Sequence, residues 1–225
     1  MKNRQLILLI VLLLIVFSLT ALVMKFYTPK DATKQEEVQT LRERQEIQIL
    51  LGQAYFLMSN GNYDLAENAL TRLFEKSPNN ILALQMSGQI YFNTKRYSEA
   101  ENIFRKLINL IPDNASNYNN LGQTLAQQGD YKKAVTYLEK AIALTPNVVT
   151  PYFNLAELYL KLHDKKQAIE TLRKAFDIAI DTRVLFLNLS AFRELEDDPE
   201  YNDLINETIK RQLAPIAEKS EGANE

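Results

Sequence analysis

Apolar and charged residues are distributed unevenly along the chain. Residues 6–24 form an apolar run without a single charged side chain, whereas residues 30–46 are rich in charged ones. Beyond residue 46 the sequence favours helices, and near its C-terminal end apolar residues recur at helical spacing (Tyr201, Leu204, Ile205, Ile209). The pattern predicts an apolar helix, a charged linker and a helical domain.

Glycines interrupt this helical domain at a regular spacing. The stretch LGQTLAQQGDYKKA at residues 121–134 favours a helix but contains Gly122 and Gly129, although glycine in a helix costs about 1 kcal/mol relative to alanine. The earlier stretch SGQIYFNTKRYSEA, at residues 87–100, has Gly88 in the place of Gly122. The same spacing relates three further sets: Tyr63, Tyr97 and Tyr131; Ala66, Ala100, Ala134 and Ala168; Pro78, Pro112 and Pro146.

A 34-residue period with these residue types resembles the tetratricopeptide repeat (TPR) family. Residues 115–148 match its signature closely, at Tyr118, Leu121, Gly122, Leu125, Ala134, Leu138, Ala141 and Pro146. The resemblance implies pairs of antiparallel helices, with Gly122 at the close approach of the two helices and Gly129 in the turn between them. The expected fold class is all-α: an N-terminal transmembrane helix followed by a right-handed TPR α-solenoid of about four to five helix pairs.

The register predicts repeat boundaries at residues 47–80, 81–114, 115–148 and 149–182. Gly52 stands two positions earlier than the period requires for a counterpart of Gly88, so we expect a two-residue insertion in the first unit. The fourth unit departs from the pattern, because Lys165 stands at the tyrosine position and Ile180 at the proline position.

The remaining C-terminal residues predict a cap and a tail. Residues 183–213 are expected to form degenerate helices that cover the end of the stack. Asp198 is suited to an N-cap and Pro199 to the first helical position. Residues 214–225 have little apolar content and are expected to be a disordered tail.

The apolar run at residues 6–24 follows a short tail, residues 1–5, that contains Lys2 and Arg4. As a helix the run would span roughly 28 Å, close to the hydrocarbon thickness of a bilayer. A cleaved signal peptide is the alternative, but the run exceeds the usual apolar length and no A-x-A-like site follows it. We therefore expect an uncleaved, single-pass membrane anchor.

Flanking charges give an expected orientation. Lys2 and Arg4 favour a cytoplasmic N-terminus, whereas Lys25, Lys30 and Lys34 lie past the other end of the run. We expect the repeats outside the cytoplasm, on the periplasmic side. In the linker, residues 25–46, Thr33 and Glu36 match a capping box, so a helical stalk and a solvated linker are both open.

The residues needed for common catalytic sites are missing from the sequence. The chain has one histidine, His163, which falls in the turn of the fourth unit, and no cysteine; Cys–His catalysis and a His/Cys zinc site are therefore excluded. No phosphate-binding loop and no G-x-S-x-G motif occurs. We expect a protein that is not an enzyme and has no cofactor or metal, with a carboxylate-dependent hydrolase as the alternative. A net charge of −2 without a basic stripe argues against nucleic acid.

In the TPR family, residues around the Leu-Gly signature point into a concave groove. The position after the small residue reads Gln53, Gln89, Gln123 and Glu157, and the position two before it reads Met86, Asn120, Asn154 and Asn188. A neighbouring set is Gln85, Phe92, Asn93, Asn119, Phe153 and Lys161. The resemblance therefore implies an amide-rich peptide-binding groove with two aromatics, and without the Lys/Arg pair of relatives that clamp a C-terminal carboxylate.

These patterns together predict a non-catalytic, membrane-tethered scaffold or assembly factor. Its partner is expected to be a polypeptide, bound as an extended segment in the groove. The alternative is a structural platform on the membrane, formed by self-association of the repeats.

Overall fold

The structure is a computed structural model that describes residues 18, 29–178 and 189–221, and every element in this part of the chain is helical. The all-α class predicted from the sequence is therefore confirmed for these residues. In chain order the elements are α2 (Pro29–Ser59), α3 (Tyr63–Lys76), α4 (Ile81–Asn93), α5 (Tyr97–Leu110), α6 (Ala115–Gln127), α7 (Tyr131–Leu144), α8 (Thr150–Lys161), α9 (Lys165–Ile178), the 3₁₀ helix η1 (Leu189–Leu195) and α11 (Pro199–Glu221).

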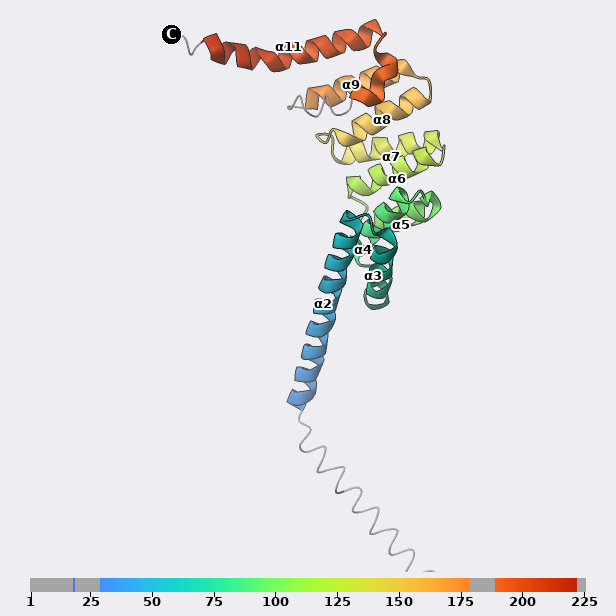
Figure 1. Cartoon of the computed structure of the whole chain (residues 1–225), viewed down its shortest axis with the longest axis vertical. Helices are drawn as coiled ribbons and strands as arrows, with labels where there is room; N and C mark the ends of the chain where they lie inside the picture. Colours follow the sequence, from blue (N-terminus) through green and yellow to red (C-terminus); the bar gives the residue numbers. More distant parts are fainter. Residues whose placement is uncertain (1–17, 19–28, 179–188, 222–225) are drawn as a thin grey trace, which may run out of the picture.

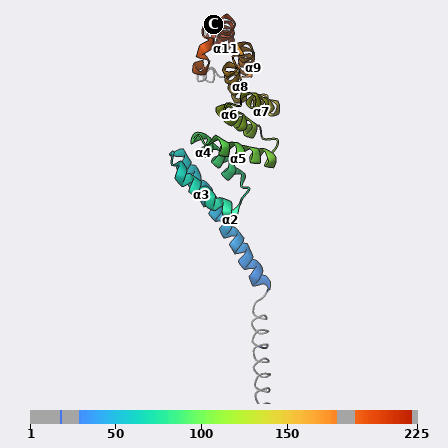
Figure 2. The ribbon, with the colours of Figure 1, turned by 90° about the vertical axis from the view of Figure 1, so that its right-hand side faces the viewer.

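The helices from α2 to α9 form successive pairs that stack into an elongated solenoid (Figures 1 and 2). Each pair packs on the next, so that the apolar core is continuous along the stack. In the third pair, Leu121, Leu125 and Leu138 are almost fully buried, as the repeat register predicts. A repeat of this kind cannot bury its apolar face alone, and its neighbours complete the core.

Two glycines allow the helices of a pair to approach closely. A Cβ atom added to Gly88 would lie 2.7 Å from Cε1 of Phe104, and one added to Gly122 would lie 2.8 Å from Cγ of Leu138. Both distances are well below van der Waals contact. Gly122 therefore lies at the close approach that the resemblance implied.

The first repeat keeps the period of the others. Gly52 is exposed and a Cβ atom there would meet nothing within 4 Å, whereas Ala54, one period before Gly88, is fully buried. The expected two-residue insertion is wrong, because Ala54 rather than Gly52 occupies the close-approach position.

The turns within the pairs show the same unbroken spacing. Positive φ angles occur at Gly61 (74°), Lys95 (61°), Gly129 (85°) and His163 (59°), each one repeat period from the next. Each ends the first helix of a pair in a left-handed residue, and the following amide donates back to the helix, as from Asp130 to the Leu125 carbonyl at 2.9 Å. The predicted turn positions of Gly129 and His163 are confirmed.

The predicted N-cap of the last helix is confirmed. Oδ1 of Asp198 accepts hydrogen bonds from the amides of Glu200 (3.0 Å) and Tyr201 (3.3 Å), and α11 begins at Pro199. Four side chains of this C-terminal part pack against the core of the fourth pair: Phe192, Leu195, Tyr201 and Leu204. The segment from η1 to α11 therefore covers the end of the stack.

Helix α11 extends further than the sequence predicted. Helix α11 continues to Glu221, so a disordered tail beginning at residue 214 is wrong; alanine, glutamate and lysine propagate the helix beyond its packed part. Residues 222–225, Ile180 and the first part of the predicted degenerate pair, residues 183–188, lie outside the described residues.

The charged linker is helical over its described part. Helix α2 runs without a break from Pro29 into the first repeat, and Thr33 and Glu36 lie inside it, so the predicted capping box does not start a helix there. A side-chain contact with α3 comes at Glu46, which pairs with Lys76 at 3.0 Å.

No helix in the described part of the chain is long and apolar enough to cross a membrane. The predicted span at residues 6–24 lies outside that part, apart from Ser18.

Candidate peptide-binding groove

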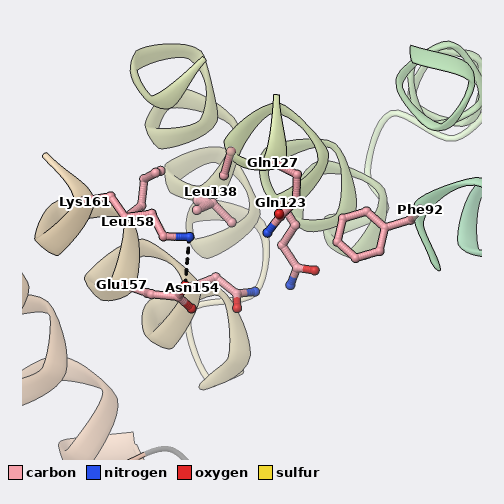
Figure 3. A pocket seen from close by; sticks show the side chains of 9 residues that line it. Phe92, Gln123, Gln127, Leu138, Asn154, Glu157, Leu158 and Lys161 are labelled. Carbon is pink, nitrogen blue, oxygen red and sulfur yellow. Dashed lines mark ion pairs between the residues drawn. The ribbon is translucent and has the colours of Figure 1, made fainter. Parts of the chain in front are cut away.

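The first helices of successive pairs border a hollow of about 150 Å³ (Figure 3). Phe92 of α4 faces Gln123 of α6 across it, while Glu157 and Lys161 of α8 lie at the other end. With Asn154, five of the predicted groove residues thus meet in one place. The hollow is also lined by Ala126, Gln127, Leu138, Asn154 and Leu158.

A second hollow, of about 450 Å³, lies at the N-terminal ends of α6 and α8. Asn119 and Asn120 line it, together with Ser116, Thr150 and Pro151. The amides of one predicted row are therefore divided between two neighbouring hollows, with Asn154 in the first and Asn120 in the second.

The half-buried asparagine amides at this boundary bond to one another. Nδ2 of Asn154 donates to Oδ1 of Asn119 at 2.8 Å, and Nδ2 of Asn119 donates to Oδ1 of Asn120 at 3.4 Å. An amide side chain carries two donors and an acceptor with two lone pairs, so each retains capacity for a further partner. The three residues form an amide cluster that joins α6 to α8.

Four other polar side chains of the predicted groove are also paired. Nε2 of Gln89 donates to Oδ1 of Asn93 at 2.8 Å, and Nδ2 of Asn93 donates to the Tyr63 hydroxyl at 3.3 Å. Glu157 and Lys161 form an ion pair of 3.0 Å along α8. Because these charges compensate each other, the groove carries little net charge.

Phe153 does not belong to the groove. Only 6% of it is exposed, and its ring centroid lies 6.2 Å from those of Phe176 and Phe192. The prediction of a second groove aromatic is wrong, because the C-terminal cap, the segment from η1 to α11, packs against Phe153. Asn119, one period earlier on α6, has no such cover and lines the second hollow.

The corrected register also changes the first repeat. Tyr55, rather than Gln53, lies one period before Gln89, and 62% of Tyr55 is exposed. Gln85 and Met86 are half-buried on α4 and line neither hollow. Asn188 lies outside the described residues.

Sequence reasoning missed Gln127, which lines the first hollow. It lies one period after Asn93 and one period before Lys161, both of which were predicted groove residues. The period alone therefore contained the signal for it.

A polar cluster between the first two pairs is structural. The Tyr91 hydroxyl donates to Glu67 at 3.1 Å, and Arg96 pairs with Glu67 at 2.8 Å while it lies 4.3 Å above the Tyr91 ring. Burial, and then the neighbouring Glu67 carboxylate, raise the pKa of the Tyr91 phenol above its ordinary value. The phenol stays protonated at neutral pH and fixes the contact between the repeats.

Among the described residues, no group of three or more His, Cys, Asp or Glu side chains could hold a metal ion.

Comparison with known proteins supports the architecture. A family model described as tetratricopeptide repeat matches residues 80–147 and 113–181. No curated protein matches the chain. A crystal structure of MamA protein superposes with a TM-score of 0.59 at 20% identity, covering 78% of this chain and 94% of that one. MamA from Desulfovibrio magneticus gives 0.57 at 20% identity, covering 69% and 88%.

An O-GlcNAc transferase from Thermobaculum terrenum gives a TM-score of 0.55 at 25% identity, covering 60% of this chain and 26% of that one. Only a quarter of the transferase is therefore matched. The likenesses to MamA show a common fold. The regular repeat period, the stacked helix pairs and the matching family model together identify residues 80–181 as tetratricopeptide repeats.

Proposed function

We propose that this chain is a membrane-tethered scaffold that holds an extended segment of a partner protein without catalysing a reaction. TPR repeats form protein-interaction scaffolds, and the MamA-like neighbours share that architecture. The single observation that carries the proposal is the amide cluster of Asn119, Asn120 and Asn154, which lies between two hollows along the first helices.

The amide cluster is suited to a peptide backbone. A backbone group offers one donor and one acceptor, and an asparagine amide can pair with both whatever the ligand's side chains. The bond from Asn119 to Asn120 is long, at 3.4 Å, so a ligand can replace it at small cost. The shorter bond from Asn154 to Asn119 keeps the two helices in position.

The first hollow supplies a place for a ligand side chain. Its volume of about 150 Å³ equals that of an engineered cavity that takes up benzene. Phe92 and Ala126 offer apolar surface there, and Gln123 and Gln127 offer hydrogen bonds. A medium-sized side chain on the bound segment therefore fits this position.

The predicted span at residues 6–24 and the continuous helix α2 support a tether that holds the repeats away from the bilayer. Between Pro29 and Glu46, before the repeats begin, α2 extends for roughly 25 Å at 1.5 Å per residue. The flanking charges favour repeats on the periplasmic side. Protease added to spheroplasts should then digest the repeats, and protection until lysis would reverse the orientation.

Photo-crosslinking on intact membranes tests the binding role. A photoreactive residue in place of Gln127, in the first hollow, should capture a partner peptide that mass spectrometry can identify. Lys140, exposed on the second helix of the same pair, is the matched control. Equal capture at both positions would contradict a groove site.

The captured segment then permits an affinity measurement. Each lost hydrogen bond costs about 0.5–1.5 kcal/mol, so the variant Asn120→Ala, Asn154→Ala should bind roughly 5- to 150-fold more weakly. Unchanged affinity would remove the amides from the site. Large, concentration-dependent assemblies of the detergent-solubilised chain, without a captured partner, would favour the structural platform instead.

A further inference from the structure

Helix α2 carries an exposed apolar stripe on the side that faces away from the repeats. Its apolar members are Val38, Leu41, Ile49 and Phe56, which are 40%, 50%, 58% and 65% exposed. Gln45, Gln48 and Gly52 lie between them at helical spacing, so the seven residues share one face about 100° wide. We call this set the outer stripe.

The repeats occupy the opposite side of the same helix. Leu50 and Ala54 are buried against the first repeat, and α3 lies to one side of α2 in Figure 1. At 100° per residue, Leu50 and Ala54 lie on the far side of the helix axis from Val38 and Phe56. Helix α2 therefore has two apolar faces, and only one of them is covered within the described residues.

The repeat period shows what the second face resembles. The positions equivalent to Ile49 are Ala83, Asn117 and Pro151, all buried. Those equivalent to Phe56 are Ile90, Thr124 and Leu158, of which no more than 2% is exposed. In α4, α6 and α8 these sides pack toward the preceding pair, which α2 lacks in the described part of the chain. The outer stripe thus corresponds to the surface by which the other repeats pack on their preceding neighbour. It continues along the part of α2 that precedes the first repeat.

We propose that a second copy of this chain covers the outer stripe, with the two α2 helices side by side and parallel. In a heptad reading, Val38, Gln45 and Gly52 take the a positions, Leu41 and Gln48 take the d positions, and Ile49 and Phe56 flank them at the e positions. Gly52 lets the helices approach closely, and Gln45 can pair with its counterpart across the seam, which fixes the register.

Charge complementarity supports a parallel, in-register pair. Glu37 takes a g position and Arg42 the following e position, so Glu37 of one copy faces Arg42 of the other. Both side chains are exposed, and neither is in an ion pair with another described residue of its own chain. The pairing therefore adds two intermolecular ion pairs without breaking an existing contact.

The direction of the pair rests on the proposed membrane tether. Two copies anchored in one bilayer present their α2 helices in the same direction, and confinement to the membrane raises their local concentration. Because α3 packs on the opposite side of α2, the outer stripe stays open to the second copy. The result is a closed pair with two separate grooves, unlike an open array.

Disulfide crosslinking of the full chain in lipid vesicles tests the pair. The chain has no cysteine, so Leu41→Cys introduces a single thiol on the outer stripe. Mild oxidation should give a covalent dimer at least tenfold faster than for Thr40→Cys, an exposed neighbour on the other side of the helix. Equal rates at the two positions, or no dimer at all, would overturn the proposal.

A second variant separates pairing from folding. Leu41→Glu together with Ile49→Glu should lower the dimer fraction at least tenfold without a change in Tm, because both side chains are exposed. Thr40→Glu should have no effect on either quantity. A dimer that survives the double substitution would overturn the role of the stripe.

Flotation with the vesicles distinguishes this proposal from the proposed tether. A chain that floats but does not crosslink contradicts the pair alone. A chain that does not float contradicts the tether and the parallel direction derived from it. A crosslink between Val38→Cys and Ile49→Cys copies, without the Leu41→Cys product, would identify an antiparallel pair and overturn the proposed direction.

Discussion

Asn154 donates a hydrogen bond of 2.8 Å to Asn119 across the boundary between the third and fourth repeats. The bond joins α6 to α8, although each belongs to a different helix pair. The amides assigned to the ligand therefore also fix the spacing between neighbouring repeats. A ligand that competes for them should alter the packing of α6 against α8.

A double-mutant cycle should reveal this link. Asn119→Ala and Asn154→Ala remove opposite ends of the same bond, so the free energies of unfolding should be non-additive by about 0.5–1.5 kcal/mol. The cycle is measured by chemical denaturation of the four proteins. Gln127→Ala with Asn154→Ala, which share no hydrogen bond, should be additive. Additivity in both cycles would show that the bond does not form in solution.

Alanine substitutions at two glycines should have opposite effects on stability. Gly122→Ala places a Cβ 2.8 Å from Cγ of Leu138, and such overpacking costs about 1–3 kcal/mol. Gly52→Ala meets nothing within 4 Å on an exposed helical surface, so the better helix propensity should add about 0.5–1 kcal/mol. Thermal melts of the two variants, in detergent at protein concentrations too low for the proposed pair to form, give the comparison. A destabilised Gly52→Ala protein would restore Gly52 as a close-approach residue.

Gly52 and Ala54 show how much of the fold the 34-residue repeat period predicts. The repeat period predicted the helix pairs, the turns and the close approach at Gly122. Counting 34 residues back from Gly88 gives Ala54, whereas matching glycine to glycine gives Gly52. Burial of Ala54 decides between the two, and burial depends on the facing helix.

The candidate site was predictable only in part, for a related reason. Five of the predicted residues line the first hollow: Phe92, Gln123, Asn154, Glu157 and Lys161. Phe153 does not, because its exposure depends on the packing of η1 and α11, which do not follow the repeat. The bond between Asn119 and Asn154 likewise depends on the distance between two helices, which sequence spacing does not give.

At the turns with positive φ, introducing a glycine and removing one should change the stability in opposite directions. Lys95 adopts φ 61° at a position where Gly129 adopts φ 85° in the next repeat. A side chain in the left-handed region costs about 1–2 kcal/mol, partly offset by the greater freedom of unfolded glycine. Lys95→Gly should therefore raise stability by up to about 1 kcal/mol, whereas Gly129→Ala should lower it. Denaturant midpoints that move in the same direction for both variants would contradict the assigned turn geometry.

The C-terminal cap should control the stability of the last repeat. Phe192 is only 1% exposed, and its ring lies 6.2 Å from that of Phe153 in the core of the fourth pair. Phe192→Ala removes a buried aromatic side chain, for which losses of about 3–5 kcal/mol are usual. Arg193→Ala, at an exposed neighbour whose contact with Glu196 is 4.0 Å long, should change stability by less than about 0.5 kcal/mol.

The location of this loss is as informative as its size. Repeats contact only their neighbours, so an uncovered end frays before the distant repeats unfold. Hydrogen exchange in Phe192→Ala should therefore accelerate in α8 and α9 while α4 and α5 remain protected. Uniform acceleration along the solenoid would show that the repeats unfold as one unit. A Tm no lower than that of Arg193→Ala would show that η1 and α11 do not cap the stack, and Phe153 would then be accessible to a ligand after all.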